Sequence, residues 1–316
     1  MTSWPILESL PSGYGVIEGS VGVLAVLESL RSDVLGAGFG PDGGESLEAS
    51  DLSGRTRLLQ FPLADGSRAV VRRFTHGGLL RVATGERYGD PQRPFKELIL
   101  SARLRSEGLP TPEVLAARAI RMHPFGWQLA LITRRVEGVK DLAVLMEARR
   151  AGQGQLAGWR RSVDAVGELI GRLHCSGFVH ADLHPRNLLL SVEALEGADP
   201  AAQVIDLDRS RFVPGLASRT RRRNLLRFAR AVRRREDRGA PFLTRGDSLR
   251  FLRAYGAGLR STGNPAPTWR EDWRRIRAYG GAAGWLHGLG WTLEKVLGRG
   301  PEARDGEAQV SRKNRG

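Results

Sequence analysis

The sequence predicts an α+β chain with two parts, an antiparallel-sheet half containing one helix and a mainly helical half. Two observations support this prediction. A strong hairpin signal, Asp65-Gly66, separates two runs of branched apolar residues in the first half. After Gly138, apolar residues recur every three or four positions, which is the helical period. The expected divisions are an N-terminal extension and linker over 1–47, the first part over 48–137, the second part over 138–300, and a disordered basic tail over 301–316.

In the first half, residues 16–35 form a mixed apolar segment that we interpret as a helix. The glycine-rich stretch 36–44 is typical of a connector, because it lacks the Lys-Ser/Thr pair that ends a phosphate-binding loop. The remaining expected elements of this half are strands over 57–63 and 68–74, a helix over 94–107 with Pro94 near its start, and strands over 114–122 and 127–136.

In the second half, the clearest element is a helix over 156–175. Its apolar residues recur at three and four positions and predict an inward face made of Trp159, Val163, Val166, Ile170 and Leu173. The other expected elements are a helix over 141–150, short strands over 188–191 and 203–207, and helices from residue 218 onward.

The composition indicates anionic partners. The 316 residues include 49 Lys and Arg against 34 Asp and Glu, a formal net charge of +15, and only four of the basic residues are lysines. A guanidinium binds phosphate or carboxylate as a planar fork. This charge is therefore typical of proteins that meet anionic lipid, nucleic acid or phosphorylated substrates. The single cysteine, Cys175, excludes an intrachain disulfide and favours a reducing compartment.

The sequence shows no secretory signal and no membrane span. The longest apolar run near the start, residues 21–27, is flanked by Glu18 and Glu28. It is far shorter than the roughly 20 apolar residues needed to cross a bilayer. We therefore expect a cytoplasmic protein that is either soluble or peripheral.

The most informative polar residues lie between positions 180 and 206. His180 and Asp182 form a His-x-Asp pair, Asn187 follows five residues after the aspartate, and Asp206 ends a short apolar run. This pattern suits phosphoryl transfer, in which the acceptor hydroxyl is held in line and metal neutralises the phosphate charge. Asp182 would accept or orient the hydroxyl proton, while Asn187 and Asp206 would be oxygen ligands of Mg²⁺.

Isolated His, Asp and Asn residues are also common turn formers. Here the apolar segments on both sides favour the catalytic interpretation over a structural one. His184 is interpreted as a loop residue. Two roles stay open for Asp208, a ligand of a second Mg²⁺ or the partner of an arginine such as Arg209.

The segments HADLHPRN and VIDLD resemble the HRDxxxxN loop and the DFG segment of the protein-kinase-like superfamily. Ala181 stands where protein kinases have Arg, and Leu207-Asp208 replaces Phe-Gly. These departures favour the small-molecule branches, which are aminoglycoside and choline phosphotransferases, RIO-like kinases and bacterial lipopolysaccharide core kinases. The resemblance implies ATP, Mg²⁺ and a two-lobed fold, with an antiparallel-sheet N-lobe that includes helix C and a mainly helical C-lobe.

The first half narrows the resemblance. AVVRRFTHGGLL (69–80) and RPFKELILSARLRSEGLPTPEVLAAR (93–118) are similar to the 3-deoxy-D-manno-octulosonic acid (Kdo) kinases, a likeness that spans roughly residues 48–260. It puts Arg72 at the position of the strand lysine and Glu97 as its ion-pair partner. Gly54 lies in a short Gly-Arg turn where protein kinases have their glycine-rich loop. A surface arginine at 72 and a solvated carboxylate at 97 are the alternatives.

Residues 209–235 contain eleven arginines, interleaved with an apolar stripe, and predict a basic amphipathic helix. It could be a solvated face, or it could contact anionic lipid headgroups or the phosphates and carboxylates of a lipopolysaccharide precursor. Arg221, Arg222 and Arg223 are the candidate contact residues. Nucleic acid is disfavoured, because the aromatic residues do not alternate with the arginines.

The resemblance implies an ATP-dependent kinase of lipopolysaccharide inner-core biosynthesis. Its acceptor would be a sugar hydroxyl of Kdo linked to lipid A, with Asp182 as base, at the anionic inner face of the inner membrane. A heptose- or aminoglycoside-directed kinase and an atypical protein kinase stay open. Cationic acceptors are disfavoured by Coulomb repulsion from the arginine-rich C-lobe, and a pseudokinase is disfavoured because the three catalytic polar residues are all present.

Overall fold

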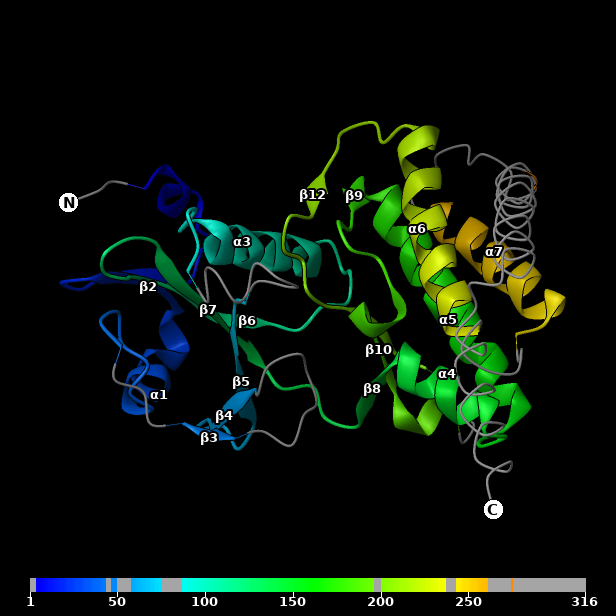
Figure 1. Ribbon diagram of the computed structural model, residues 1–316, viewed down its shortest axis with the longest axis horizontal. Helices are drawn as coiled ribbons and strands as arrows, with labels where there is room; N and C mark the ends of the chain where they lie inside the picture. Colours follow the sequence, from blue (N-terminus) through cyan, green and yellow to red (C-terminus); the bar gives the residue numbers. More distant parts are fainter. Residues whose placement is uncertain are drawn as a thin grey trace, which may run out of the picture. The chain divides into compact units, whose positions relative to one another are not determined.

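The computed structural model describes residues 4–43, 47–49, 58–75, 87–195, 200–236, 243–260 and residue 274. The chain divides into two compact units, residues 1–266 and 267–316, and every helix and strand named below lies in the first. Figure 1 shows the elements in chain order. The predicted tail over 301–316 lies outside the described residues.

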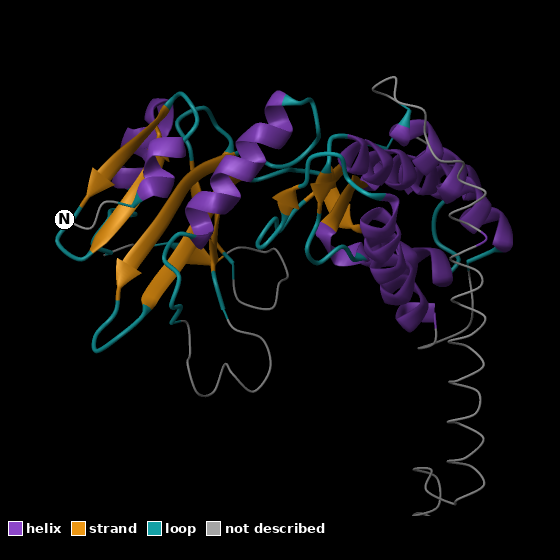
Figure 2. Cartoon of the chain, turned by 90° about the horizontal axis from the view of Figure 1, so that it is seen from above, coloured by secondary structure: helices purple, strands orange, loops and turns teal. Residues whose placement is uncertain are grey.

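The N-terminal lobe is built on a seven-stranded antiparallel sheet with the order β1-β2-β6-β7-β5-β4-β3. The long α3 (Arg93–Ser106) packs on β6 and β7, and Figure 2 shows helix beside the strands of this lobe. The strands are β1 (Tyr14–Glu18), β2 (Gly22–Leu27), β3 (Glu48–Ala49), β4 (Leu59–Pro62), β5 (Arg68–Arg73), β6 (Val114–Arg121) and β7 (Trp127–Arg134). The predicted hairpin, the predicted helix and the two predicted strands after it are therefore confirmed.

Each face of this sheet has its own apolar core. One core joins the sheet to the short helix α1 (Arg31–Gly36) and includes Phe39 and Ile132. The other lies under α3 and includes Phe95 and Leu131. Because apolar side chains fill both faces, the central strands are almost continuously buried, and β6 is buried from Val114 to Ile120.

The predicted helix over 16–35 is wrong for residues 16–27, whereas residues 31–35 lie in α1 and are helical as predicted. Residues 14–27 form the hairpin of β1 and β2, and β2 pairs with β6. A short apolar run fits a buried strand as well as a helix, and its periodicity cannot separate the two. Pairing with β6 decides in favour of the strand, since it satisfies the backbone groups of residues 22–26. The sheet thus begins within the segment that we assigned to an extension.

The C-terminal lobe is mainly helical, with two small sheets of order β11-β10-β8 and β12-β9. Its helices are α4 (Leu142–Arg150), α5 (Leu156–Cys175), α6 (Ser218–Glu236) and α7 (Arg245–Leu259), with one-turn helices η3 (Pro185–Asn187) and η4 (Val192–Leu195). Its strands are β8 (Val139–Asp141), β9 (Phe178–Val179), β10 (Leu188–Ser191), β11 (Ala202–Val204) and β12 (Arg211–Phe212). All five residues of the predicted inward face of α5 are buried.

Helices α5 and α7 approach each other at glycines. A Cβ atom added at Gly171 would lie 2.3 Å from the Tyr255 carbonyl oxygen, and one at Gly258 would lie 2.3 Å from the Glu168 carbonyl oxygen. Larger side chains at these positions would force the helices apart. The close packing brings Tyr255 of α7 against His174 of α5, which contributes to the site described next.

Within the described parts of the chain, no helix combines the length and apolar character needed to span a membrane.

Candidate active site

The loop between β9 and β10 carries the His-x-Asp pair and is organised by His180. The His180 ring is buried, its Nδ1 accepts a hydrogen bond from the Asp182 backbone N–H (3.2 Å), and its Nε2 donates to the Ile205 carbonyl (3.0 Å). Burial lowers the pKa of His180 despite the Ile205 bond. The ring is therefore neutral with its proton on Nε2, and it joins the Asp182 loop to Ile205, the residue before Asp206.

Asp182 presents its carboxylate to solvent at the tip of this loop, with a side chain that is 55% exposed. Its Oδ2 lies 3.3 Å from Nε2 of His184, and its Oδ1 lies 3.6 Å from a guanidinium nitrogen of Arg227. The Asn187 side-chain N–H donates to the Asp182 carbonyl (2.9 Å), so both residues are held in one turn. His184 is a loop residue as expected, but it lies next to Asp182.

Asp206 has a left-handed backbone with φ 61°, which is uncommon for a residue other than glycine. This conformation ends the extended backbone, so β11 stops at Val204 although we predicted a strand over 203–207. It lets the carboxylate meet the guanidinium of Arg72, with 2.7 Å between Oδ1 and Nη1. Sparsely populated backbone conformations concentrate at functional sites.

Arg72 bridges two carboxylates. Its Nη2 lies 2.6 Å from Oε2 of Glu97 on α3, so the predicted ion pair is present, and its Nη1 bonds Asp206. The Arg72 guanidinium also lies over the Phe74 ring, 4.6 Å from its centre. The second oxygen of Glu97 accepts the backbone N–H of Leu207 (3.1 Å). Strand β5, helix α3 and the segment after Asp206 therefore meet at one buried carboxylate.

Burial dominates the electrostatics of this group. The Glu97 side chain is 4% exposed, and burial raises its pKa to about 7 although the Arg72 guanidinium opposes the rise. Burial would lower the pKa of Arg72, but the carboxylates of Glu97 and Asp206 outweigh it and raise that pKa. Arg72 therefore stays charged, and breaking its pair with Glu97 would leave a buried carboxylate without its cation.

A second ion pair, which the sequence analysis missed, joins α3 to the same segment. Arg93 reaches Asp208 with both Nε (3.1 Å) and Nη2, and it stacks over the Tyr88 ring. Arg209, by contrast, lies 4.0 Å from Asp208. Of the two roles left open for Asp208, the structure shows the arginine partner. The available signal was the spacing, because Arg93 and Glu97 are one helical turn apart on α3.

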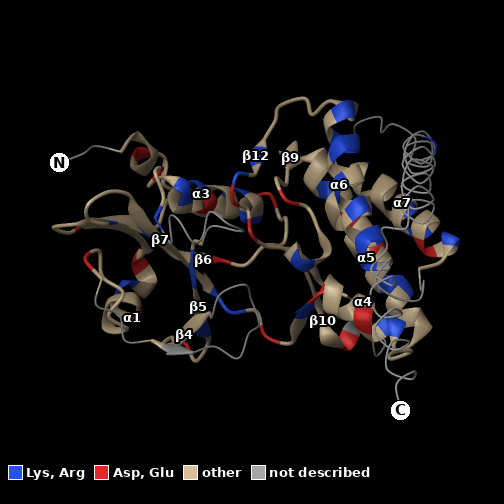
Figure 3. Ribbon diagram, in the orientation of Figure 1, with Lys and Arg blue, Asp and Glu red and all other residues tan. Residues whose placement is uncertain are grey.

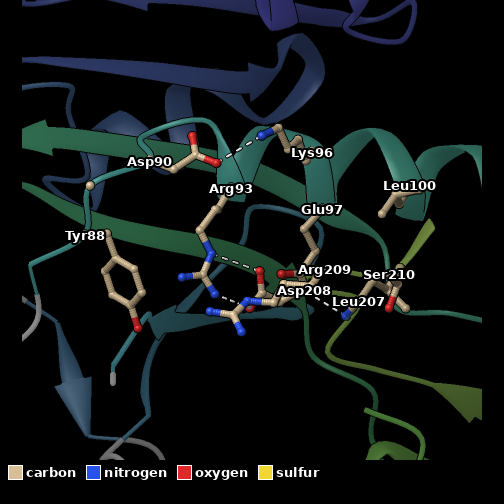
Figure 4. Close-up of a pocket in the computed structure, with 11 residues that line it drawn as sticks. Tyr88, Asp90, Arg93, Lys96, Glu97, Leu100, Leu207, Asp208, Arg209 and Ser210 are labelled. Carbon is tan, nitrogen blue, oxygen red and sulfur yellow. Dashed lines mark hydrogen bonds and ion pairs between the residues drawn. The ribbon is translucent and has the colours of Figure 1, made fainter. Parts of the chain in front are cut away.

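These residues line a cavity of about 420 Å³ between α3 and the segment 207–210 (Figure 4). Arg93, Glu97 and Asp208 point toward one another there, whereas Lys96 points to Asp90 (3.0 Å). Neither Asp182 nor Asn187 is among the lining residues. The cavity is therefore lined by residues of the Glu97 and Asp208 side, and the exposed carboxylate of Asp182 is not part of it.

The predicted contact arginines of α6 differ in exposure. Arg221 is buried, with 9% exposed, and donates to the Ser218 hydroxyl (3.2 Å), so its side chain does not lie on the exposed face. Arg222 is half-buried and Arg223 is exposed. Arg227, which sequence reasoning did not single out, is the α6 arginine that reaches Asp182. The predicted Gly54 and its turn lie outside the described residues.

A chain of hydrogen bonds holds α6 to the Asp182 loop. The Asn224 amide donates to the His180 carbonyl (2.7 Å), and its oxygen lies 3.0 Å from Nε2 of His174. The Nδ1 atom of His174 lies 3.0 Å from the Tyr255 hydroxyl. Burial lowers the pKa of His174 to about 4, so this ring is neutral. The chain fixes α6, and hence Arg227, relative to the Asp182 loop.

The chain is similar in sequence to known proteins. Residues 68–255 match the Lipopolysaccharide kinase (Kdo/WaaP) family. A 3-deoxy-D-manno-octulosonic acid kinase of Xylella fastidiosa (strain M12) is 34% identical over 203 residues, covering 62% of this chain and 74% of that protein. One from Xanthomonas axonopodis pv. citri (strain 306) is 34% identical over 206 residues with the same coverage. A solved structure of WaaP in complex with acyl carrier protein aligns with TM-score 0.49 and 23% identity, over 78% of this chain and 89% of that chain.

The family match covers more than half of the chain. It begins at the first residue of β5 and ends within α7, so it includes Arg72, Glu97, Asp182, Asn187 and Asp206. The two-lobed α+β architecture agrees with the fold expected from the sequence. The chain belongs to the lipopolysaccharide kinase (Kdo/WaaP) family.

Proposed function

We propose that this protein is an ATP-dependent kinase that phosphorylates a sugar hydroxyl of Kdo linked to lipid A. One observation carries the proposal: Arg72 bonds Glu97 and Asp206 at once, while Asp182 stands exposed on a loop that His180 ties to the residue before Asp206. A kinase needs this combination of a fixed phosphate-binding side and an accessible acceptor side. The curated relatives named above carry the name of that activity.

In this proposal Asp182 is the catalytic base. Its carboxylate is exposed, so an acceptor hydroxyl can reach it, and the His180 ring and the Asn187 amide fix its backbone. A carboxylate placed within hydrogen-bond distance orients the hydroxyl for in-line attack and takes its proton as the new bond forms.

The residues around Asp206 fit a Mg²⁺–ATP complex. Mg²⁺ binds hard oxygen ligands, takes only one or two of them from the protein, and keeps several waters. Asn187 offers an amide oxygen, because its N–H group is already committed to the Asp182 carbonyl, and Asp206 offers a carboxylate. The described residues hold no cluster of three or more His, Cys, Asp and Glu side chains suited to a metal. The bound metal would neutralise charge that develops on the phosphates, and Arg72 would add its guanidinium on the same side.

The exposed arginines of α6 support an anionic acceptor over a cationic one. Figure 3 shows basic residues along the whole of this helix. An aminoglycoside would be repelled there, whereas anionic headgroups and phosphorylated saccharides would be attracted. We therefore propose that the enzyme works peripherally at the inner face of the inner membrane, where Kdo linked to lipid A would be presented with its lipid.

The test is phosphate transfer from ATP to Kdo-bearing lipid A precursor by the purified protein. Asp182→Asn should lower the transfer rate by about 10³-fold, because general base catalysis and hydroxyl orientation are lost. Asp164→Asn, a half-exposed aspartate of α5 paired with Arg250 (2.7 Å), is the matched control and should keep the wild-type rate. Transfer to heptose, aminoglycoside or peptide acceptors, but not to the Kdo-bearing precursor, would contradict the proposal.

A further inference from the structure

The exposed face of α6 carries a stripe of arginines at helical spacing. Arg219, Arg223, Arg227, Arg230 and Arg234 are all exposed. Their steps of four, four, three and four residues put them on one face of a helix. At 1.5 Å per residue, the stripe spans roughly 22 Å. Its middle member, Arg227, is the residue that reaches Asp182.

The contact between Arg227 and Asp182 is loose. The two side chains are each 55% exposed, and the nearest oxygen and nitrogen are 3.6 Å apart, beyond the ordinary hydrogen-bond range. Exposed ion pairs of this kind contribute little to stability. The Arg227 guanidinium can therefore exchange Asp182 for another anion at little cost. Arg72 differs, since its bonds of 2.6 and 2.7 Å to two carboxylates fix it in place.

The position of the Arg227 guanidinium next to Asp182 indicates which part of the acceptor it would contact. If Asp182 is the base, the reacting hydroxyl sits against its carboxylate, and Arg227 faces the groups attached to neighbouring carbons of the same sugar. A guanidinium forms a planar fork that matches the two oxygens of a carboxylate or phosphate. A neutral sugar offers it no such partner.

We propose that Arg227 is the acceptor-positioning residue, which binds an oxyanion carried by the acceptor sugar and thereby aligns its hydroxyl with Asp182. The rest of the stripe then accommodates further anionic groups of the same acceptor along α6. This inference rests on the proposed kinase activity and adds a requirement to it, namely that the acceptor must carry a negative charge close to the reacting hydroxyl.

The experiment compares Arg227→Gln and Arg227→Lys with the wild type, and uses Arg160→Gln as a control that removes an exposed arginine from α5. Each protein is assayed with the sugar-acid acceptor, with the same acceptor after its carboxylate is converted to an amide, and with an acceptor whose lipid phosphates are removed. The KM for ATP and the slow ATP hydrolysis without acceptor are measured in parallel.

We expect Arg227→Gln to raise the KM for the charged acceptor by about tenfold or more, as for loss of a charge-assisted hydrogen bond. The KM of Arg227→Lys for the charged acceptor should lie between those of the wild type and Arg227→Gln. The KM for ATP should not change in either variant. If the oxyanion is the sugar carboxylate, the amide acceptor should be equally poor for wild type and Arg227→Gln. If the oxyanion is a lipid phosphate, the dephosphorylated acceptor should instead be equally poor for the wild type and Arg227→Gln.

Two results would overturn the inference while leaving the proposed function intact. The first is an equal effect of Arg227→Gln on every acceptor, charged or modified. The second is a rise in the KM for ATP alone, which would put Arg227 on the transferred phosphate. Failure of the wild-type protein to phosphorylate any of the acceptors would instead refute the proposed function, and the inference with it.

Discussion

The α3 side of the site, which meets Asp206, and the α6 side, which meets Asp182, are built in opposite ways. On the α3 side, Arg72, Glu97 and the Leu207 N–H form short contacts around a buried carboxylate. On the α6 side, Arg227 and Asp182 are half-exposed and separated by 3.6 Å. A phosphate donor that is the same in every cycle suits a rigid, preorganised site. The lipid-linked acceptor that we propose is bulky and must enter and leave, which suits an open site with contacts that exchange readily.

Removing Arg72 is the strongest test of whether the α3 side is more rigid than the α6 side. Arg72→Met should lower kcat/KM by about 100-fold or more and destabilise the fold by about 3 kcal/mol, because Glu97 is left buried without its cation. The double variant with Glu97→Leu should recover most of the stability but none of the activity. Thermal unfolding and steady-state kinetics on the same samples separate these effects. Arg73→Met, one residue along β5 on the opposite face of the strand, is the control.

If Arg72→Met were as stable as the wild type, the α3 side would be no more rigid than the α6 side. Recovery of activity in the double variant would also contradict the contrast between the two sides, since the pair would then serve only the fold.

The second prediction concerns the hydrogen bonds that hold α6. Burial, with a smaller contribution from Arg221, lowers the pKa of His174 to about 4 in the folded protein, against about 6.5 when unfolded. Between these values the unfolded chain binds the extra proton, so stability falls as the pH falls from 6.5 toward 4. The expected loss from His174 alone is about 2 kcal/mol between pH 7 and pH 5.

Urea unfolding at several pH values measures this loss. His174→Gln should flatten part of the pH dependence, and the remainder belongs in part to His180, which is also buried with a lowered pKa. A slope unchanged in His174→Gln would show that His174 is already solvated or charged in the folded protein.

The smallest expected effect comes from the second ion pair on the α3 side. Arg93→Gln and Asp208→Asn should each lower kcat by about tenfold, because the segment after Asp206 loses one of its two attachments to α3. The two variants should need the same Mg²⁺ concentration for half-maximal activity. A higher Mg²⁺ requirement in Asp208→Asn alone would assign Asp208 to a second metal ion and weaken the structural interpretation.

Much of the rigid side could be predicted from the sequence. The hairpin signal at Asp65-Gly66 and the helix beginning near Pro94 fix β4, β5 and α3, and the resemblance to Kdo kinases then pairs Arg72 with Glu97. These features depend on local turn chemistry and on short spacings, which a single sequence displays directly.

The rest depends on contacts between distant segments. Strand β2 is a strand because it pairs with β6, nearly 100 residues later, and no local property of GVLAVL decides this. The partner of Asp208 is 115 residues away in Arg93. Arg221 and Arg227 look equivalent in an arginine-rich segment, and the packing of α6 decides which of them is buried.

The left-handed backbone of Asp206 restricts which amino acids can replace it. With φ at 61°, glycine, asparagine and aspartate are the residues best tolerated there. Alanine would remove the carboxylate and also strain the turn, so an inactive alanine variant would not separate lost chemistry from a displaced loop. Asparagine keeps the turn and changes only the charge. The main chain therefore limits which residues can occupy position 206, and the proposed metal-binding role would require aspartate among them.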